Sequence, residues 1–183
     1  VKSPDHEFVS RGGLKLQGAI EAFEVSISGR IAADLGASTG GFTDCLLQHD
    51  AAKVYAIDVG YGQLAWKIRQ DERVVVMERT NARHLQSLEE PVNLVVGDLS
   101  FISLRLILPA IARIAAPNSD CLLLVKPQFE VGREAIAKGG VVSEASEREA
   151  AVQQVLHDAE ALGFKPLGHI QSPIQGAKSG NIE

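Results

Sequence analysis

Short apolar runs alternate with amphipathic segments along most of the chain. The apolar runs predict strands at residues 31–35, 53–58, 74–77, 92–97, 121–126 and 166–170. Helical patterns lie between most of these runs; before the first run, for example, Leu16, Ile20 and Phe23 share one helical face. Strands that alternate with helices in this way predict an α/β fold, with a doubly wound parallel sheet and helices on both faces.

The second half of the chain carries three further local predictions. Pro109 falls inside an apolar helical pattern, so we expect a kink or a short break there. Residues 127–143 form a long connection that is rich in glycine, which we interpret as a flap facing the substrate. Ser146 and Glu149 have the spacing of a capping box, and Gly163 is the expected stop of the helix that follows.

A turn rich in glycine follows the first predicted strand, within residues 31–42. In an open α/β sheet this turn lies at the carboxyl edge, where ligands bind. The dinucleotide fingerprint needs a glycine where Ser38 stands, and Asp58 closes the next apolar run, where it can accept hydrogen bonds from ribose hydroxyls. These residues fit NAD or S-adenosylmethionine (SAM), and Ser38 favours SAM. The alternative is that the glycine-rich turn serves only the packing of the helix against the strand.

Polar residues also end the later apolar runs. Asp98 follows the run at 92–97, and Lys126 ends the run at 121–126, where the next residue, proline, holds it extended. A lysine at the end of a buried strand needs a partner or a function, and Asp98 is the expected partner. An ion pair that only fixes the strand ends is the alternative. Asn81 suits an ordinary turn or a contact with adenine, and its spacing favours the turn.

Composition narrows the class of protein. The 183 residues are enough for one domain with a sizeable core. No apolar run approaches the ~20 residues of a membrane helix, so we expect no membrane partner. The two cysteines lie in apolar contexts, as in a reducing compartment such as the cytoplasm, and the five histidines lack metal-ligand spacing. The net charge of −5 argues against binding to nucleic acid by electrostatics alone.

Five blocks of the sequence carry a family resemblance: SRGGLK (10–15), DLGASTGGF (34–42), GDLSFIS (97–103), VKPQFEVGR (125–133) and KGGVV (138–142). Together they resemble the TlyA group, hemolysin-A-like ribosomal RNA methyltransferases of the FtsJ-type superfamily. The resemblance runs from residue 9 to residue 183. It implies a Rossmann-like methyltransferase that uses SAM to methylate a ribose 2′-hydroxyl of ribosomal RNA, with cytidine as the expected nucleotide and the RNA or a ribosomal subunit as partner.

The resemblance also implies roles for individual residues. The implied catalytic residues are Lys15, Asp98, Lys126 and Glu183. The implied cofactor-binding residues are Gly36, Ser38, Gly40, Phe42, Asp58, Asn81 and Asp98. We assign Lys126 as the base and Asp98 as the residue that orients it. Lys15 and Glu183 are assigned as positioning groups. A lysine acts as a base only when neutral, a form that burial and a second ammonium nearby favour.

The resemblance divides the chain into a flexible linker at residues 1–10 and a methyltransferase domain at 11–183. An S4-like RNA-binding domain is expected before this segment, and a final antiparallel strand after Glu183. The pair Ser38-Thr39 departs from the superfamily, whose members carry Ala-Pro there. Three other functions stay open: an NAD-dependent oxidoreductase on the same fold, a membrane-active hemolysin, and an RNA-binding module without chemistry.

Overall fold

The computed structural model describes residues 7–177 and 180–183. Its central sheet has five strands in the order β3-β2-β1-β4-β5, and every neighbouring pair is parallel. The strands are β1 (Ile31–Leu35), β2 (Lys53–Ile57), β3 (Val74–Met77), β4 (Val92–Gly97) and β5 (Ala115–Leu123). The order reverses between β1 and β4, so the chain winds outward from the centre in both directions, which confirms the doubly wound sheet.

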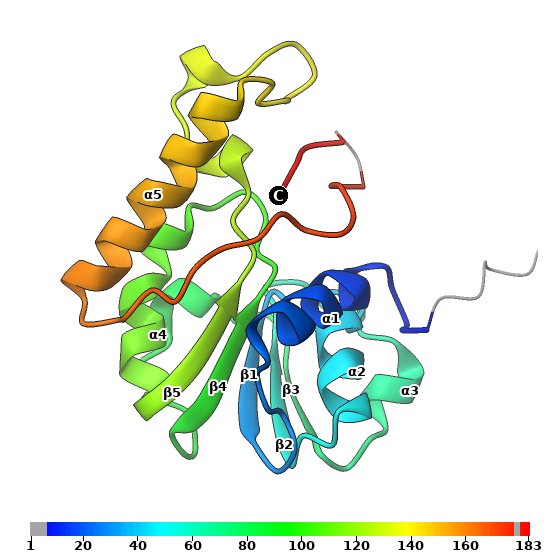
Figure 1. The fold of residues 1–183 in the computed structure, drawn as a ribbon. Coiled ribbons are helices and arrows are strands. Elements are labelled where there is room, and N and C mark those ends of the chain that lie inside the picture. Colours follow the sequence, from blue (N-terminus) through cyan, green and yellow to red (C-terminus); the bar gives the residue numbers. More distant parts are fainter. Residues whose placement is uncertain (1–6, 178–179) are drawn as a thin grey trace, which may run out of the picture.

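Helices cover both faces of the sheet, as predicted. The α-helices are α1 (Gly12–Phe23), α2 (Gly41–Gln48), α3 (Trp66–Arg69), α4 (Leu108–Ile114) and α5 (Ala145–Ala161). Short 3₁₀ turns are η1 (Ala82–His84), η2 (Leu104–Leu106), η3 (Pro127–Phe129) and η4 (Arg133–Ala135). Figure 1 shows α1, α2 and α3 on one side of the sheet and α4 and α5 on the other.

Two apolar cores lie on the opposite faces of the sheet. Ala32, Val54 and Leu94 pack under α1 and α2, whereas the next residues along the same strands pack under α4. Because consecutive strand residues point to opposite faces, the central strands are buried on both sides. This burial explains why they appear in the sequence as continuous apolar runs. It also leaves the ends of the strands as the places where polar side chains can reach a ligand.

Two of the six strand predictions need correction. The strand predicted at 121–126 is β5, which spans Ala115–Leu123 and therefore starts earlier and ends before Lys126. A register shift between Val92 and Leu94 in β4 lets β5 continue through its polar residues. Residues 166–170 form no strand; this segment contains Pro166, which has no N–H to donate, and Gly168 at φ 146°.

The local predictions had mixed outcomes. A break before Pro109 is confirmed, because η2 ends at Leu106 and Pro109 lies in the first turn of α4. The capping box was wrong, since α5 begins at Ala145 and no side chain caps it, which leaves Ser146 inside the first turn. Gly163 follows α5 with φ 89°, the left-handed conformation expected where a helix stops.

The two ends of the described chain meet at α1. Phe8 is buried and the Val9 N–H donates to Asp44 Oδ2 at 2.8 Å, so the second half of the predicted linker packs onto the domain. Residues 1–6 of that linker lie outside the described residues. After α5 the chain runs back across the sheet toward α1 (Figure 1). There the side chain of Glu183 contacts Lys15.

Candidate active site

The β1–α2 loop is held close to two neighbouring strands. The Gly36 N–H donates to Ile57 O at 2.8 Å, and a Cβ at Gly36 would lie 2.7 Å from Asp98 O, so only glycine fits. Gly36 has φ 81° and Gly40 has φ 100°. Ser38 also has a positive φ, 50°, which is uncommon for a residue other than glycine. The residue that breaks the glycine fingerprint thus adopts a backbone conformation that favours glycine.

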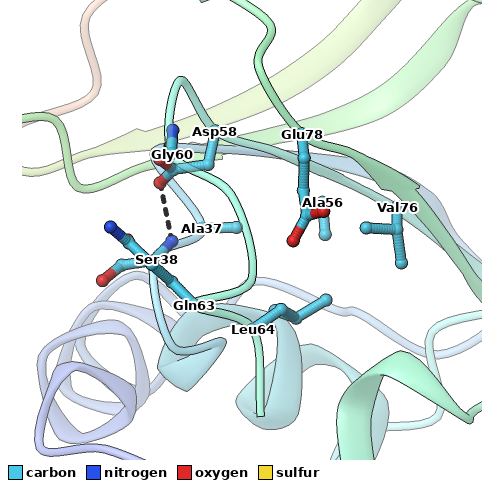
Figure 2. Close-up of a pocket in the computed structure, with 9 residues that line it drawn as sticks. All are labelled: Ala37, Ser38, Ala56, Asp58, Gly60, Gln63, Leu64, Val76 and Glu78. Carbon is cyan, nitrogen blue, oxygen red and sulfur yellow. Dashed lines mark hydrogen bonds between the residues drawn. The ribbon is translucent and has the colours of Figure 1, made fainter. Parts of the chain in front are cut away.

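Asp58 joins this loop to the chain that follows β2. Its Oδ2 accepts from Ser38 N at 2.8 Å, and its Oδ1 accepts from Gly60 N at 2.7 Å. Figure 2 shows Asp58 facing Ser38 at one side of a small pocket. The pocket is lined by Ala37, Ser38, Ala56, Asp58, Gly60, Gln63, Leu64, Val76 and Glu78. Of the predicted cofactor residues, Ser38 and Asp58 line this pocket.

Glu78 closes the pocket beside β3 and is a residue that the sequence analysis missed. Its Oε1 accepts from Gly62 N at 2.9 Å and also pairs with Arg69. The hydrogen bond from Arg69 holds the pKa of Glu78 below its usual range. The sequence contained the pattern that could have identified Glu78. It directly follows the third apolar run, and Asp58 closes the second.

Asp34 lies beneath the same loop and is fully buried. Thr43 Oγ1 donates to its Oδ2 at 2.7 Å, whereas its Oδ1 has no hydrogen-bond partner among residues 7–177 and 180–183. Burial, together with the nearby charges of Asp98 and Asp58, raises the pKa of Asp34 to about 7, against the lowering effect of the hydrogen bond from Thr43. The carboxyl group therefore gains a proton near neutral pH.

Asp98 and Lys126 form an ion pair at the carboxyl edge of β4 and β5, as predicted. Lys126 Nζ lies 2.5 Å from Asp98 Oδ1, with 10% of the lysine side chain and 23% of the aspartate side chain exposed. Lys126 Nζ also donates to Ser100 Oγ at 2.8 Å. Ser100 was not predicted from the sequence, although its position two residues after Asp98 places a hydroxyl at the same edge.

A second ion pair joins Lys15 of α1 to Glu183, whose side chains are 9% and 3% exposed. The start of α1 borders Asp98, because a Cβ at Gly12 would lie 3.8 Å from Asp98 Oδ2. Both pairs therefore border the start of α1. The four residues predicted as catalytic come from separate parts of the chain, and the fold arranges them as two lysine–carboxylate pairs.

The remaining predicted cofactor residues lie outside the pocket lining. Phe42 is 5% exposed and packs in the core beneath α1. Asn81 is exposed, and its Oδ1 accepts from Arg83 N at 3.0 Å, so it takes the turn role that its spacing favoured. The cofactor contacts of all seven residues, Gly36, Ser38, Gly40, Phe42, Asp58, Asn81 and Asp98, stay predictions.

The connection predicted as a flap has structure of its own. It contains η3, η4 and an antiparallel bridge between Ala137 and Val141. Glu130 anchors its start, because its carboxylate accepts from Ser103 Oγ at 2.5 Å and from Leu104 N at 2.7 Å. Burial raises the pKa of Glu130. This anchor fixes the chain just after Lys126.

A doubly wound parallel sheet, with a glycine-rich loop after β1 and an acid after β2, defines a Rossmann-like α/β protein with a ligand site at the carboxyl edge. The sequence model of the FtsJ-like methyltransferase family matches residues 8–183. The chain belongs to this family of methyltransferases.

Relatives with assigned names support this membership. The 16S/23S rRNA (cytidine-2′-O)-methyltransferase TlyA of Mycobacterium tuberculosis is 51% identical, over 100% of this chain and 69% of its own. Hemolysin A of Brachyspira hyodysenteriae is 43% identical, over 97% of this chain and 75% of its own. A solved structure from Streptococcus thermophilus has a TM-score of 0.94 and 48% identity, over 99% of this chain and 66% of that one. The chain thus spans about two thirds of the length of several relatives.

Within the described ranges, no helix is both long and apolar enough to cross a membrane.

Proposed function

We propose that this protein transfers a methyl group from SAM to a ribose 2′-hydroxyl of ribosomal RNA. Membership of the FtsJ-like family supports the reaction class, and the name of the Mycobacterium tuberculosis relative supports the RNA substrate and cytidine. The observation that carries the proposal is the pair of Lys126 and Asp98 beside the glycine-rich loop. The lysine side chain of this pair is 10% exposed, and its amine lies at the edge of the sheet where folds of this class bind ligands.

The residues around the pocket fit SAM. Each oxygen of Asp58 accepts one backbone N–H, and a carboxylate oxygen has a second lone pair that a ribose hydroxyl can use. Ala37, Leu64 and Val76 supply an apolar lining for a purine ring. SAM would bring an activated methyl group to this edge of the sheet. We infer that Ser38 and Asp58 hold its adenosine end.

The chain's own residues would carry the proton chemistry. A ribose hydroxyl is a weak nucleophile. A base that removes its proton as the new bond forms typically raises the reaction rate ~10²–10⁴-fold. In our proposal Lys126 Nζ, in its neutral form, takes this proton and becomes an ammonium, while Asp98 and Ser100 fix the direction of the amine. Lys15 and Glu183 hold the ribose in line, and such positioning can supply roughly 7–11 kcal/mol.

The test is methyl transfer by the purified protein to ribosomal subunits, with labelled SAM and mass analysis of nuclease digests. We expect 2′-O-methylated nucleotides in the product. Lys126→Ala should lower the rate by about a hundredfold or more while calorimetry shows little change in SAM affinity, because Lys126 lies outside the pocket lining. Lys165→Ala, at an exposed lysine after α5, is the matched control and should keep the rate.

Two results would contradict the proposal. Full activity of Lys126→Ala would remove the lysine from the chemistry. Binding of NAD in preference to SAM, measured by the same calorimetry, would instead support an oxidoreductase. The comparison is direct because both ligands carry an adenosine ribose that Asp58 can bind.

A further inference from the structure

Asn181 connects the C-terminal segment to the end of the flap. The residue is 1% exposed, and both polar atoms of its amide are bonded to the same short stretch of backbone. Its Oδ1 accepts from Val142 N at 3.0 Å, and its Nδ2 donates to Gly140 O at 2.9 Å. A single side chain thus satisfies a donor and an acceptor that a neighbouring strand would otherwise satisfy.

The stretch that Asn181 binds is buried at one end, where Val142 is 1% exposed, and open at the other, where two glycines lie. Gly139 and Gly140 have φ of 93° and 80°, and a Cβ at either position would meet nothing within 4 Å. Two backbone hydrogen bonds close a turn around these glycines inside the flap, from Ala137 N to Val141 O and from Gly140 N to Ala137 O. Outside this turn, Arg148 Nη1 donates to Val142 O at 3.2 Å.

The same segment also sets the position of Glu183. Gly176 N donates to Asn181 O at 2.9 Å, and Ser172 N donates to Glu183 O at 2.8 Å, so the backbone around Asn181 is closed into a loop. Glu183 follows Asn181 by two residues and pairs with Lys15. A shift of the Asn181 side chain would therefore move both the flap and the carboxylate.

We infer that Asn181 is a positioning residue, which closes the flap at Gly140–Val142 and thereby holds Glu183 at Lys15 for methyl transfer. This inference rests on the proposed function, because it assigns Asn181 to the methyl-transfer site. Its physical basis is the paired hydrogen bonds of a buried amide, which are lost together when the side chain is removed.

Trypsin tests the closure without any catalysis. Lys138 is exposed and lies in the flap, two residues before Gly140. Asn181→Ala should speed cleavage after Lys138 at least about tenfold, because the two hydrogen bonds that hold this stretch are gone. Gln171→Ala, at an exposed residue of the same C-terminal segment, is the matched control and should keep the cleavage rate. Circular dichroism melting confirms that both variants are folded.

Asn181→Asp tests the donor separately from the acceptor. The introduced carboxylate can still accept from Val142 N, but it faces Gly140 O without a proton at about pH 8. We expect fast hydrogen exchange in the peptide 136–150 at that pH, after correction for intrinsic rates. Protection should return toward pH 5, where a buried carboxyl group gains a proton and donates again. Asn181→Ala should show no such recovery.

Methyl transfer completes the test. Asn181→Ala should lower kcat at least about tenfold and leave SAM affinity within about twofold, because its contacts lie away from the pocket at β1–β3. Unchanged cleavage after Lys138 would overturn the inference, and so would faster cleavage with unchanged kcat. Absence of methyl transfer by the unaltered protein would contradict the proposed function, whereas the cleavage and exchange results would still test the closure.

Discussion

At the scale of single residues, Asp34 gives the fold a dependence on pH. Its carboxyl group is fully buried, and burial raises its pKa to about 7 from 3.8. Between these two values the folded protein binds more protons at this group than the unfolded chain does. The contribution of Asp34 to stability therefore falls as pH rises through this range, by a few kcal/mol at most, and stays constant above about pH 7.

Asp34→Asn removes this dependence while keeping an oxygen that Thr43 Oγ1 can bond. We expect the variant to gain stability relative to the unaltered protein as pH rises from about 5 to 8, because it never buries a charge. Urea unfolding at these two pH values measures the difference. Asp120→Asn, at a carboxylate that is 37% exposed, is the control. A stability difference for Asp34→Asn that does not change with pH would contradict the prediction.

At the scale of elements, the β1–α2 loop depends on glycine for two separate reasons at Gly36. The residue has φ 81°, and a Cβ there would lie 2.7 Å from the Asp98 carbonyl oxygen. Gly36→Ala should therefore introduce both strain from the left-handed backbone and a clash with the backbone. We expect it to lower the free energy of unfolding by about 2–4 kcal/mol and to weaken SAM binding. Gly29→Ala separates the two causes, because Gly29 has φ 73° and a Cβ there meets nothing within 4 Å.

Chemical denaturation of the two glycine variants measures the costs, and calorimetry measures SAM affinity. Gly29→Ala should cost about 1–2 kcal/mol and leave SAM affinity unchanged. Equal costs for the two variants would show that the chain relieves the clash at Gly36 by moving Asp98. In that case the ion pair with Lys126 should also change, which a nuclear magnetic resonance titration of the lysine amine would detect.

Strands whose apolar pattern follows from burial could be predicted from the sequence. Strands whose bounds depend on pairing with a neighbouring strand could not. β1, β2 and β4 are largely buried apolar runs and β3 is a half-buried one, and their predicted bounds agree with the structure to within one residue. β5 also includes Asn118 and Asp120, because pairing with β4 carries it through polar residues. Periodicity alone cannot show such a partner, and it cannot show that a segment with Pro166 lacks one.

The same distinction applies to the candidate site. Asp58 and Lys126 end apolar runs and Asp98 directly follows one, so the edge to which they belong could be predicted. Lys15 and Glu183 were named through a family resemblance, and their contact joins segments 168 positions apart. Ser100 and Asn181 were missed because their roles depend on which backbone or amine lies opposite them.

At the scale of the whole molecule, the pair of Lys15 and Glu183 ties the first helix to the last described residue. Their side chains are 9% and 3% exposed, so either charge alone would be buried without its partner. Breaking such a pair typically costs about 3–5 kcal/mol, whereas removing both charges costs much less. Lys15→Met and Glu183→Gln should therefore each destabilise strongly, and the double variant should lose at least about 1 kcal/mol less than their sum.

A second pair provides the comparison. Arg30 Nη1 lies 2.6 Å from Asp120 Oδ2, but these side chains are 25% and 37% exposed, so a double-mutant cycle there should give a coupling below about 1 kcal/mol. Urea unfolding of both sets of variants measures the two couplings. A coupling for Lys15 and Glu183 no larger than that for Arg30 and Asp120 would mean that the first pair does not hold the termini together. The carboxylate would then be free to leave the site, and its role in positioning a ribose would have no structural support.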